Sequence, residues 1–224
     1  MIVELSLTIS DTSAVYPGVD KNAYDPIARM DDGDLNNATF VRHFLHTGTH
    51  VDAPFHFDNQ GARIDQIPIE DFAYHRPLLI DVPKTRGQLI TASDLAPYAE
   101  EIRKADLVLF HTGFIAHIDD EPVYQDDFPA IDLEVARMFR DEFLNVVAVS
   151  IDTLSIESIH GPEDGFPVHL QLLHHEQSDN RPLLVYENTN TLPLVGKTPK
   201  TVWALPIRFA GTEAAPVAMI AEVD

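Results

Sequence analysis

The sequence predicts an α/β fold built around a mixed central sheet. Most of its apolar runs are short, continuous and rich in β-branched residues, as buried strands tend to be. Only two segments show clear helical spacing, so strands outnumber helices. With 224 residues, 45% of them hydrophobic, the chain is long and apolar enough for a substantial core. We therefore expect residues 1–224 to form one domain of this class.

Eight segments are predicted as strands. They carry the apolar, β-branched runs described above, and most are about as long as an ordinary strand. In chain order they are Val3–Ile9, Thr39–Val51, Leu78–Val82, Leu107–His111, Val146–Ile151, Leu183–Glu187, Trp203–Phe209 and a last one near Val217–Val223.

Two segments are predicted as helices, near Ser93–Arg103 and Asp132–Phe143. In both, apolar residues recur three and four positions apart and so share one face. Asp132 precedes the second stripe and is a suitable N-cap. We interpret both stripes as core-facing. The acidic segments Asp20–Asp34 and His117–Pro129 are predicted as solvated surface loops, with a lid over a site as the less favoured alternative.

The charge balance excludes several classes of partner. Lys and Arg total 15 against 36 Asp and Glu, which gives a net charge of −21. Binding to nucleic acid or to anionic membranes needs a basic surface, so neither is expected. The acidic surface favours solubility, and adaptation to high salt is a second interpretation. The expected partner is a small-molecule substrate.

Cysteine is absent, which excludes disulfides, thiolate ligands and a cysteine nucleophile. Any metal must then be held by His, Asp or Glu. Residues 1–7 have no basic segment followed by a long apolar run, and no stretch is long enough to span a membrane. We therefore expect a cytoplasmic protein.

The segment 46–56 contains the most informative motif, with three histidines and one aspartate in eleven residues. If the chain is extended as far as Asp52, alternation places His46, His50 and Asp52 on the same face. Gly48 lies between them and adds no side chain there. Two imidazoles and a carboxylate are a common ligand set for Zn²⁺ or Mn²⁺.

Pro54 ends regular strand pairing and should turn the chain. His56 then approaches the same site from another direction, where it could move protons beside a metal. His43 has the opposite parity, so we expect its side chain to point away. Four of the eleven histidines lie between His43 and His56, which favours a metal site over a chance cluster on the surface.

This segment resembles the H-x-G-T-H-x-D-x-P-x-H signature of the metal-dependent cyclase-like hydrolase family. That family includes kynurenine formamidases (arylformamidases) and isatin hydrolases. The resemblance spans nearly the whole chain. Further matching segments are Tyr16–Gly18, His111–Phe114, Ile151–Ile156, Phe166–His169 with the pair Leu172 and Leu173, and Val185–Asn188.

The resemblance implies a swivelling β/β/α domain that assembles as a homodimer or homotetramer with shared active sites. It also implies two adjacent metal ions per subunit, Zn²⁺ or Mn²⁺. His46, His50 and Asp52 would bind the first ion. Asp52 and Glu187 would be shared with the second, which His169 completes. If only one ion binds, both carboxylates could still be ligands.

The position of the distal histidine is open, because the interval between His169 and Glu187 is longer than is usual in the family. His174 and His175 are therefore rivals of His169, which we favour because it precedes a Leu-Leu pair. The segment 174–181 would then be a surface insertion. Asp152 also matches the family, and we expect it to support the site or brace a loop without being a ligand.

The implied reaction is metal-assisted hydrolysis of an amide C–N bond in a small aromatic substrate. A metal-bound hydroxide would attack the carbonyl, and His56 would act as general acid and base. Tyr16 would contact the substrate, in place of the usual tryptophan. N-formyl-kynurenine is the favoured substrate, but His111 replaces a common arginine. A cyclic amide or lactone of the isatin type, a condensing cyclase and a non-catalytic metal-binding protein therefore stay open.

Overall fold

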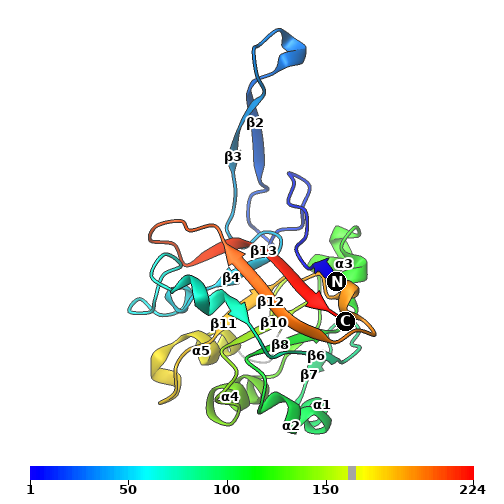
Figure 1. Cartoon of the computed structure of the whole chain (residues 1–224), viewed down its shortest axis with the longest axis vertical. Helices are drawn as coiled ribbons and strands as arrows, with labels where there is room; N and C mark the ends of the chain where they lie inside the picture. Colours follow the sequence, from blue (N-terminus) through cyan, green and yellow to red (C-terminus); the bar gives the residue numbers. More distant parts are fainter. Residues whose placement is uncertain (161–164) are drawn as a thin grey trace.

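A mixed nine-stranded sheet organises the fold (Figure 1). The computed structural model describes residues 1–160 and 165–224. The strand order is β5-β12-β13-β4-β11-β10-β8-β6, with β1 paired to β13. The strands are β1 (Ile2–Glu4), β4 (His50–Asp52), β5 (Ala73–Tyr74), β6 (Pro77–Asp81), β8 (Leu107–His111), β10 (Ala148–Ile151), β11 (Leu184–Glu187), β12 (Pro199–Pro206) and β13 (Ala214–Val223). The predicted α/β class with a mixed central sheet is confirmed.

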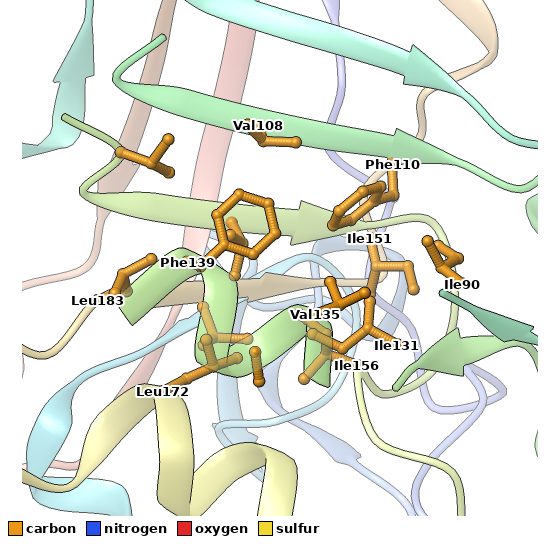
Figure 2. Close-up of a cluster of buried hydrophobic side chains, with 14 of the residues drawn as sticks. Ile90, Val108, Phe110, Ile131, Val135, Phe139, Ile151, Ile156, Leu172 and Leu183 are labelled. Carbon is orange, nitrogen blue, oxygen red and sulfur yellow. The ribbon is translucent and has the colours of Figure 1, made fainter. Parts of the chain in front are cut away.

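The parallel half of this sheet contains β6, β8, β10 and β11. Every residue of β8, β10 and β11 is buried, because both faces of these strands are covered. Figure 2 shows the core on the helical side, where Val108, Phe110 and Ile151 face Val135 and Phe139. The strand predictions over these segments are confirmed to within two residues.

Three helices pack beside or around this half. Helix α4 (Leu133–Asp141) begins as predicted, with Asp132 Oδ1 accepting a hydrogen bond from Glu134 N at 2.7 Å. The predicted helix 93–103 is interrupted by a 3-10 turn at residues 96–98, which contains Pro97. The result is two short helices, α1 (Ala92–Leu95) and α2 (Ala99–Ile102). Proline removes one backbone donor, which accounts for the interruption.

Two other helices were not predicted from the sequence. Helix α5 (Pro167–Leu173) packs against α4 and carries His169, and α3 (Glu121–Gln125) lies in a segment predicted as a loop. Each has seven residues or fewer, too short for a clear periodic pattern. The remaining elements are β7 (Leu89–Ile90) with β9 (Ala130–Ile131), and the 3-10 helices η1 (Met30–Asp32), η2 (Pro54–His56), η3 (Ile69–Phe72), η4 (Ala96–Tyr98), η5 (Phe114–His117), η6 (His175–Gln177) and η7 (Leu192–Leu194).

An antiparallel hairpin projects from the body of the molecule (Figure 1). It consists of β2 (Ala23–Ala28) and β3 (Ala38–Arg42), which pair only with each other in the described sheets. The prediction of a loop over 20–34 is therefore wrong for β2. The hairpin is joined at its tip by η1 and residues 33–37, and we call residues 23–42 the arm. Its charged residues hid the strand pattern because both faces of the arm are largely exposed.

The prediction of one strand over Thr39–Val51 is also wrong. The chain leaves β3 after Arg42, turns where Thr47 N donates to Phe44 O, and re-enters the sheet only at His50. Gly48 has a φ of +69°, and a Cβ there would lie 2.6 Å from Ile9 Cγ1. Both observations require glycine at this turn. The strand predicted over Val3–Ile9 is likewise limited to β1.

No helix in the described residues is long and apolar enough to cross a lipid bilayer.

Candidate metal centre

Three acidic and imidazole side chains meet at the centre of the sheet because of its register. His50 and Asp52 are alternate residues of β4 and share one face. Glu187 of β11 is the cross-strand neighbour of His50. His50 Nε2 lies 3.5 Å from Asp52 Oδ1 and 3.4 Å from Glu187 Oε2. One donor atom from each of the three lies within 4.8 Å of the others, which is suitable for holding one cation.

His46 reaches this cluster by a different route from the one predicted. It lies before the turn at Gly48 and not on a continuous strand, yet its Nδ1 is 2.9 Å from Asp52 Oδ1. Pro54 turns the chain into η2, as predicted, and brings His56 back toward the site. The His46 and His56 rings are 4.3 Å apart, and their donors together with Asp52 lie within 4.8 Å of one another.

His169 on α5 completes the group from the other side. Its Nε2 lies 3.2 Å from Glu187 Oε1 and 3.8 Å from Asp52 Oδ2. Its ring stacks on Phe57 at 5.0 Å. The structure thus brings together all five side chains predicted as metal ligands. The rivals His174 and His175 cluster with Asp58, outside this group.

Sequence reasoning missed Glu157, which fixes the orientation of His169. Glu157 Oε2 accepts a hydrogen bond from His169 Nδ1 at 2.8 Å, and its Oε1 accepts one from Val168 N at 3.0 Å. The carboxylate therefore caps the start of α5 and leaves His169 Nε2 directed at Glu187. The only sequence signal is its place in the loop that follows β10.

The carboxylate of Glu187 and the ring of His50 are oriented in a similar way. Glu187 Oε1 accepts hydrogen bonds from Ser155 Oγ at 2.9 Å and Ile156 N at 2.8 Å. His50 Nδ1 lies 2.9 Å from the carbonyl oxygen of Gly48, so it donates there and leaves Nε2 without a proton in the neutral ring. Glu213, also missed from sequence, lies 3.3 Å from His46 Nε2 through its Oε1.

Three buried atoms of this cluster accept no aligned hydrogen bond: His50 Nε2, Asp52 Oδ1 and Asp52 Oδ2. The 2.9 Å contact of His46 Nδ1 with Asp52 Oδ1 has the distance of an ion pair but not the alignment of a hydrogen bond. His50 and Asp52 are both 0% exposed. Buried polar atoms without partners are rare because they lose the free energy of hydration. Imidazole nitrogen and carboxylate oxygen are ligands of Zn²⁺ and Mn²⁺, so the donor set fits a divalent ion placed among these atoms.

The pKa values of the histidines reflect the same excess of negative charge. Burial alone lowers the pKa of His46, but Asp52, Glu213 and Glu187 outweigh it and raise the pKa to about 10. Burial also opposes the charge of His169, but Glu157, Glu187 and Asp52 raise its pKa to about 10. In the metal-free chain at neutral pH, protons on these two rings offset part of the negative charge of the carboxylates. An ion that binds there must displace them.

His56 behaves in the opposite way. Burial, together with the neighbouring His46 and His169, lowers its pKa to about 4, although Asp52 and Glu187 oppose this. Its imidazole is therefore neutral at pH 7 and has a lone pair that can accept a proton.

A cavity of about 350 Å³ opens over the cluster. His46, His56, His169 and Glu187 border it on one side. Four aromatic rings form much of its wall, together with Val19 and Leu154: Tyr16, Phe44, Phe57 and Phe166. Tyr16, which was predicted to contact the substrate, is one of these lining residues. No lysine or arginine is among the described residues that line this cavity.

Asp152 and His111 lie outside the cavity wall. Asp152 Oδ1 accepts hydrogen bonds from Thr112 N and Oγ1, and its Oδ2 accepts one from Gly113 N. Asp152 thus braces the loop at Thr112 and Gly113, which is one of the two roles expected for it. His111 Nδ1 lies 2.7 Å from Thr191 Oγ1. His43 is also absent from the cavity lining, but not for the predicted reason, because β3 ends at Arg42 and strand parity does not apply to this residue.

A family model described as "Putative cyclase" matches residues 3–158. A kynurenine formamidase from Salinibacter ruber is 28% identical over 221 residues, which cover 96% of this chain and 94% of that protein.

Two solved structures are similar over almost the whole chain. Isatin hydrolase A from Labrenzia aggregata, bound to benzyl benzoate, superposes with a TM-score of 0.82 at 20% identity, covering 99% of this chain and 93% of that one. A protein described as a potential metal-dependent hydrolase with cyclase activity has a TM-score of 0.72 at 22% identity, covering 99% and 96%. At these identities the structures establish the fold. The sequence relative supports a hydrolase.

Replacement of Glu157 by alanine is expected to lower the affinity for Zn²⁺ by about 10–100-fold, because the ring of His169 loses the carboxylate that orients it. Competition with a chromogenic chelator measures this change. Glu142→Ala, which removes an exposed glutamate after α4, should leave the affinity unchanged. Equal affinities of the Glu157→Ala variant and the unmodified chain would contradict this role.

Proposed function

The chain belongs to the family described as "Putative cyclase", and we propose that it is a metal-dependent hydrolase of an amide bond in small aromatic substrates. The observation that carries this proposal is the aromatic cavity placed directly over the buried His–Asp–Glu cluster. Relatives named as hydrolases support the same class of reaction.

In our assignment, His46, His50 and Asp52 would hold one divalent ion and His169 would hold a second, with Asp52 and Glu187 available to both. The three unpartnered buried atoms of His50 and Asp52 support this assignment. Zn²⁺ is the proposed ion, with Mn²⁺ as the alternative, and two ions bind per subunit. Ions held there supply Lewis acidity, which lowers the pKa of water and stabilises negative charge on a carbonyl oxygen.

His56 moves the proton in this proposal. It borders the cavity and is neutral at pH 7, so its imidazole accepts a proton from the attacking water. The resulting imidazolium lies beside Asp52 and Glu187, which favour its positive charge. It then donates the proton to the leaving nitrogen. The aromatic wall orients the substrate ring and excludes bulk water from the reacting carbonyl.

The cavity favours an aromatic amide without a free carboxylate. N-formyl-kynurenine carries a carboxylate on its amino-acid chain, and no lysine or arginine among the described lining residues pairs with it. An anion placed there without a partner would lose its hydration. A cyclic amide of the isatin type is uncharged and fits the apolar wall. The name of the Salinibacter ruber relative supports N-formyl-kynurenine as the second candidate.

Two functions of other classes are less well supported. A non-catalytic metal-binding protein has no need for a neutral histidine beside the ligands and bordering an aromatic cavity, as His56 is here. A condensing cyclase would use the same ions and differs only in the direction of the reaction.

We propose that the arm packs against a second copy of the chain in a homodimer or a homotetramer. Leu35, Ile27 and Phe40 of the arm are 97%, 72% and 65% exposed. An isolated two-stranded hairpin is marginally stable in water, so the arm needs a surface that covers its apolar side chains. A second copy of the chain is always present together with the first, and its surface would cover these side chains.

The His56→Ala variant tests the proton-transfer role. We expect kcat to fall by about 10²–10⁴-fold while the metal content stays unchanged. His75→Ala, at an exposed histidine outside the cavity, is the control and should keep full turnover. Normal turnover by the His56→Ala variant would contradict the role.

Three substrates separate the effect of charge from that of the amide type: isatin, formanilide and N-formyl-kynurenine. Formanilide has the N-formyl group of N-formyl-kynurenine but lacks its charged amino-acid chain. We expect kcat/KM for isatin and formanilide to exceed that for N-formyl-kynurenine by at least about tenfold, a difference of roughly 1.4 kcal/mol. The reverse order would identify an anion-binding group and assign the second candidate.

Sedimentation of arm variants tests the assembly. Ile27→Ser and Phe40→Ser should raise the dissociation constant of the oligomer by at least about tenfold, since large apolar side chains dominate such interfaces. Leu144→Ser changes an exposed leucine outside the arm and should leave it unaffected. An unmodified chain that sediments as a monomer would exclude the proposal.

A further inference from the structure

A second group of imidazole and carboxylate side chains lies outside the central cavity. One donor atom each from Asp58, His174 and His175 lies within 4.8 Å of the others. They border a separate hollow of about 490 Å³, and His56 and Phe57 are the described residues that it shares with the central cavity. The function proposed above does not use these residues.

Asp58 is the buried anchor of this group and is 3% exposed. Its Oδ1 accepts a hydrogen bond from Gln60 N at 2.9 Å. Its Oδ2 accepts one from His175 N at 3.3 Å and lies 2.5 Å from His175 Nδ1. Among the described residues, no lysine or arginine forms an ion pair with Asp58, so histidine is its only possible cationic partner.

A buried arginine holds the loop that carries His174 and His175 in place. Arg140 of α4 is 0% exposed and donates to the carbonyl oxygens of Gln171, His174 and Asn180 at 2.6, 3.1 and 2.7 Å. The rings of His174 and His175 stack at 5.1 Å with an interplanar angle of 13°. The backbone around both imidazoles is therefore fixed before any ligand binds, which lowers the entropic cost of binding.

We propose that Asp58, His174 and His175 form a second, separate site for a divalent transition metal ion. Two imidazoles and a carboxylate match Zn²⁺ and related ions, and they do not match Mg²⁺ or Ca²⁺, which prefer oxygen ligands. The ion takes the place of the hydrogen between His175 Nδ1 and Asp58 Oδ2; a neutral ring keeps that hydrogen on Nε2, and a charged ring releases one proton to solvent.

This site should bind more weakly than the central cluster. The side chain of His175 is 45% exposed and therefore hydrated, whereas His50 and Asp52 of the central cluster are fully buried. Asp58 follows η2 by two residues, and the shared His56 and Phe57 connect the two hollows. An ion bound here would therefore fasten the 174–177 segment to Asp58, which directly follows the cavity-lining residues His56 and Phe57.

Counting Zn²⁺ equivalents by titration against a chromogenic chelator tests the proposal. The unmodified chain should bind one weaker equivalent in addition to the central ones. That equivalent should disappear, or weaken at least about tenfold, in Asp58→Asn and in His175→Ala. Turnover at limiting Zn²⁺ should persist in both variants. His160→Ala is the matched control, since it removes an exposed histidine 3.3 Å from Asp126 without a second histidine in the group.

If Asp58→Asn fails to fold, the exposed His175 keeps the test decisive. An unchanged number of equivalents in the His175→Ala variant would overturn the proposal. The His50→Ala variant distinguishes the two sites. It should lose central equivalents and keep the weaker one, so a failure of the proposed function and a failure of this site give different results.

Discussion

The carboxylate of Asp52 is fully buried at the centre of the sheet, and neither of its oxygens accepts an aligned hydrogen bond. Such a group is costly unless positive charge is brought to it. His46, His50 and His169 all approach it within 4 Å, from a turn, a strand and a helix. The sheet register and the docking of α5 together create a buried negative charge that only protons or cations can neutralise.

A surrounding layer of polar groups keeps the ligands in orientation. Glu157 holds His169, Ser155 holds Glu187, and the carbonyl oxygen of Gly48 holds His50. The contacts to His169 and His50 use the ring nitrogen that faces away from the cluster and leave the other nitrogen free for it. Glu187 Oε1 accepts from Ser155 and also lies 3.2 Å from His169 Nε2, while its Oε2 lies 3.4 Å from His50 Nε2. The turn at Gly48 has two functions, because its positive φ brings His46 toward Asp52 and its carbonyl orients His50.

The sequence predicted the elements whose pattern is local. Strands β8, β10 and β11 are continuous apolar runs, and Asp132 is a cap recognisable from its neighbours. The pair His50 and Asp52 followed from strand alternation. His46 was placed at the site for the wrong reason, because the turn replaces the predicted strand. Glu157 and Glu213 could not be found in this way, since their roles depend on contacts across 12 and 167 residues. The arm was missed because its strands have no buried face.

The central claim is that the buried cluster exists to hold divalent metal ions that the reaction requires. Metal analysis of the purified chain, paired with turnover of isatin, tests it most directly. The account predicts about two equivalents of Zn²⁺ or Mn²⁺ at the central cluster, and a loss of both metal and turnover in the His50→Ala variant. Turnover that persists in a chain stripped of metal, or a central cluster that binds no ion after reconstitution, would contradict it.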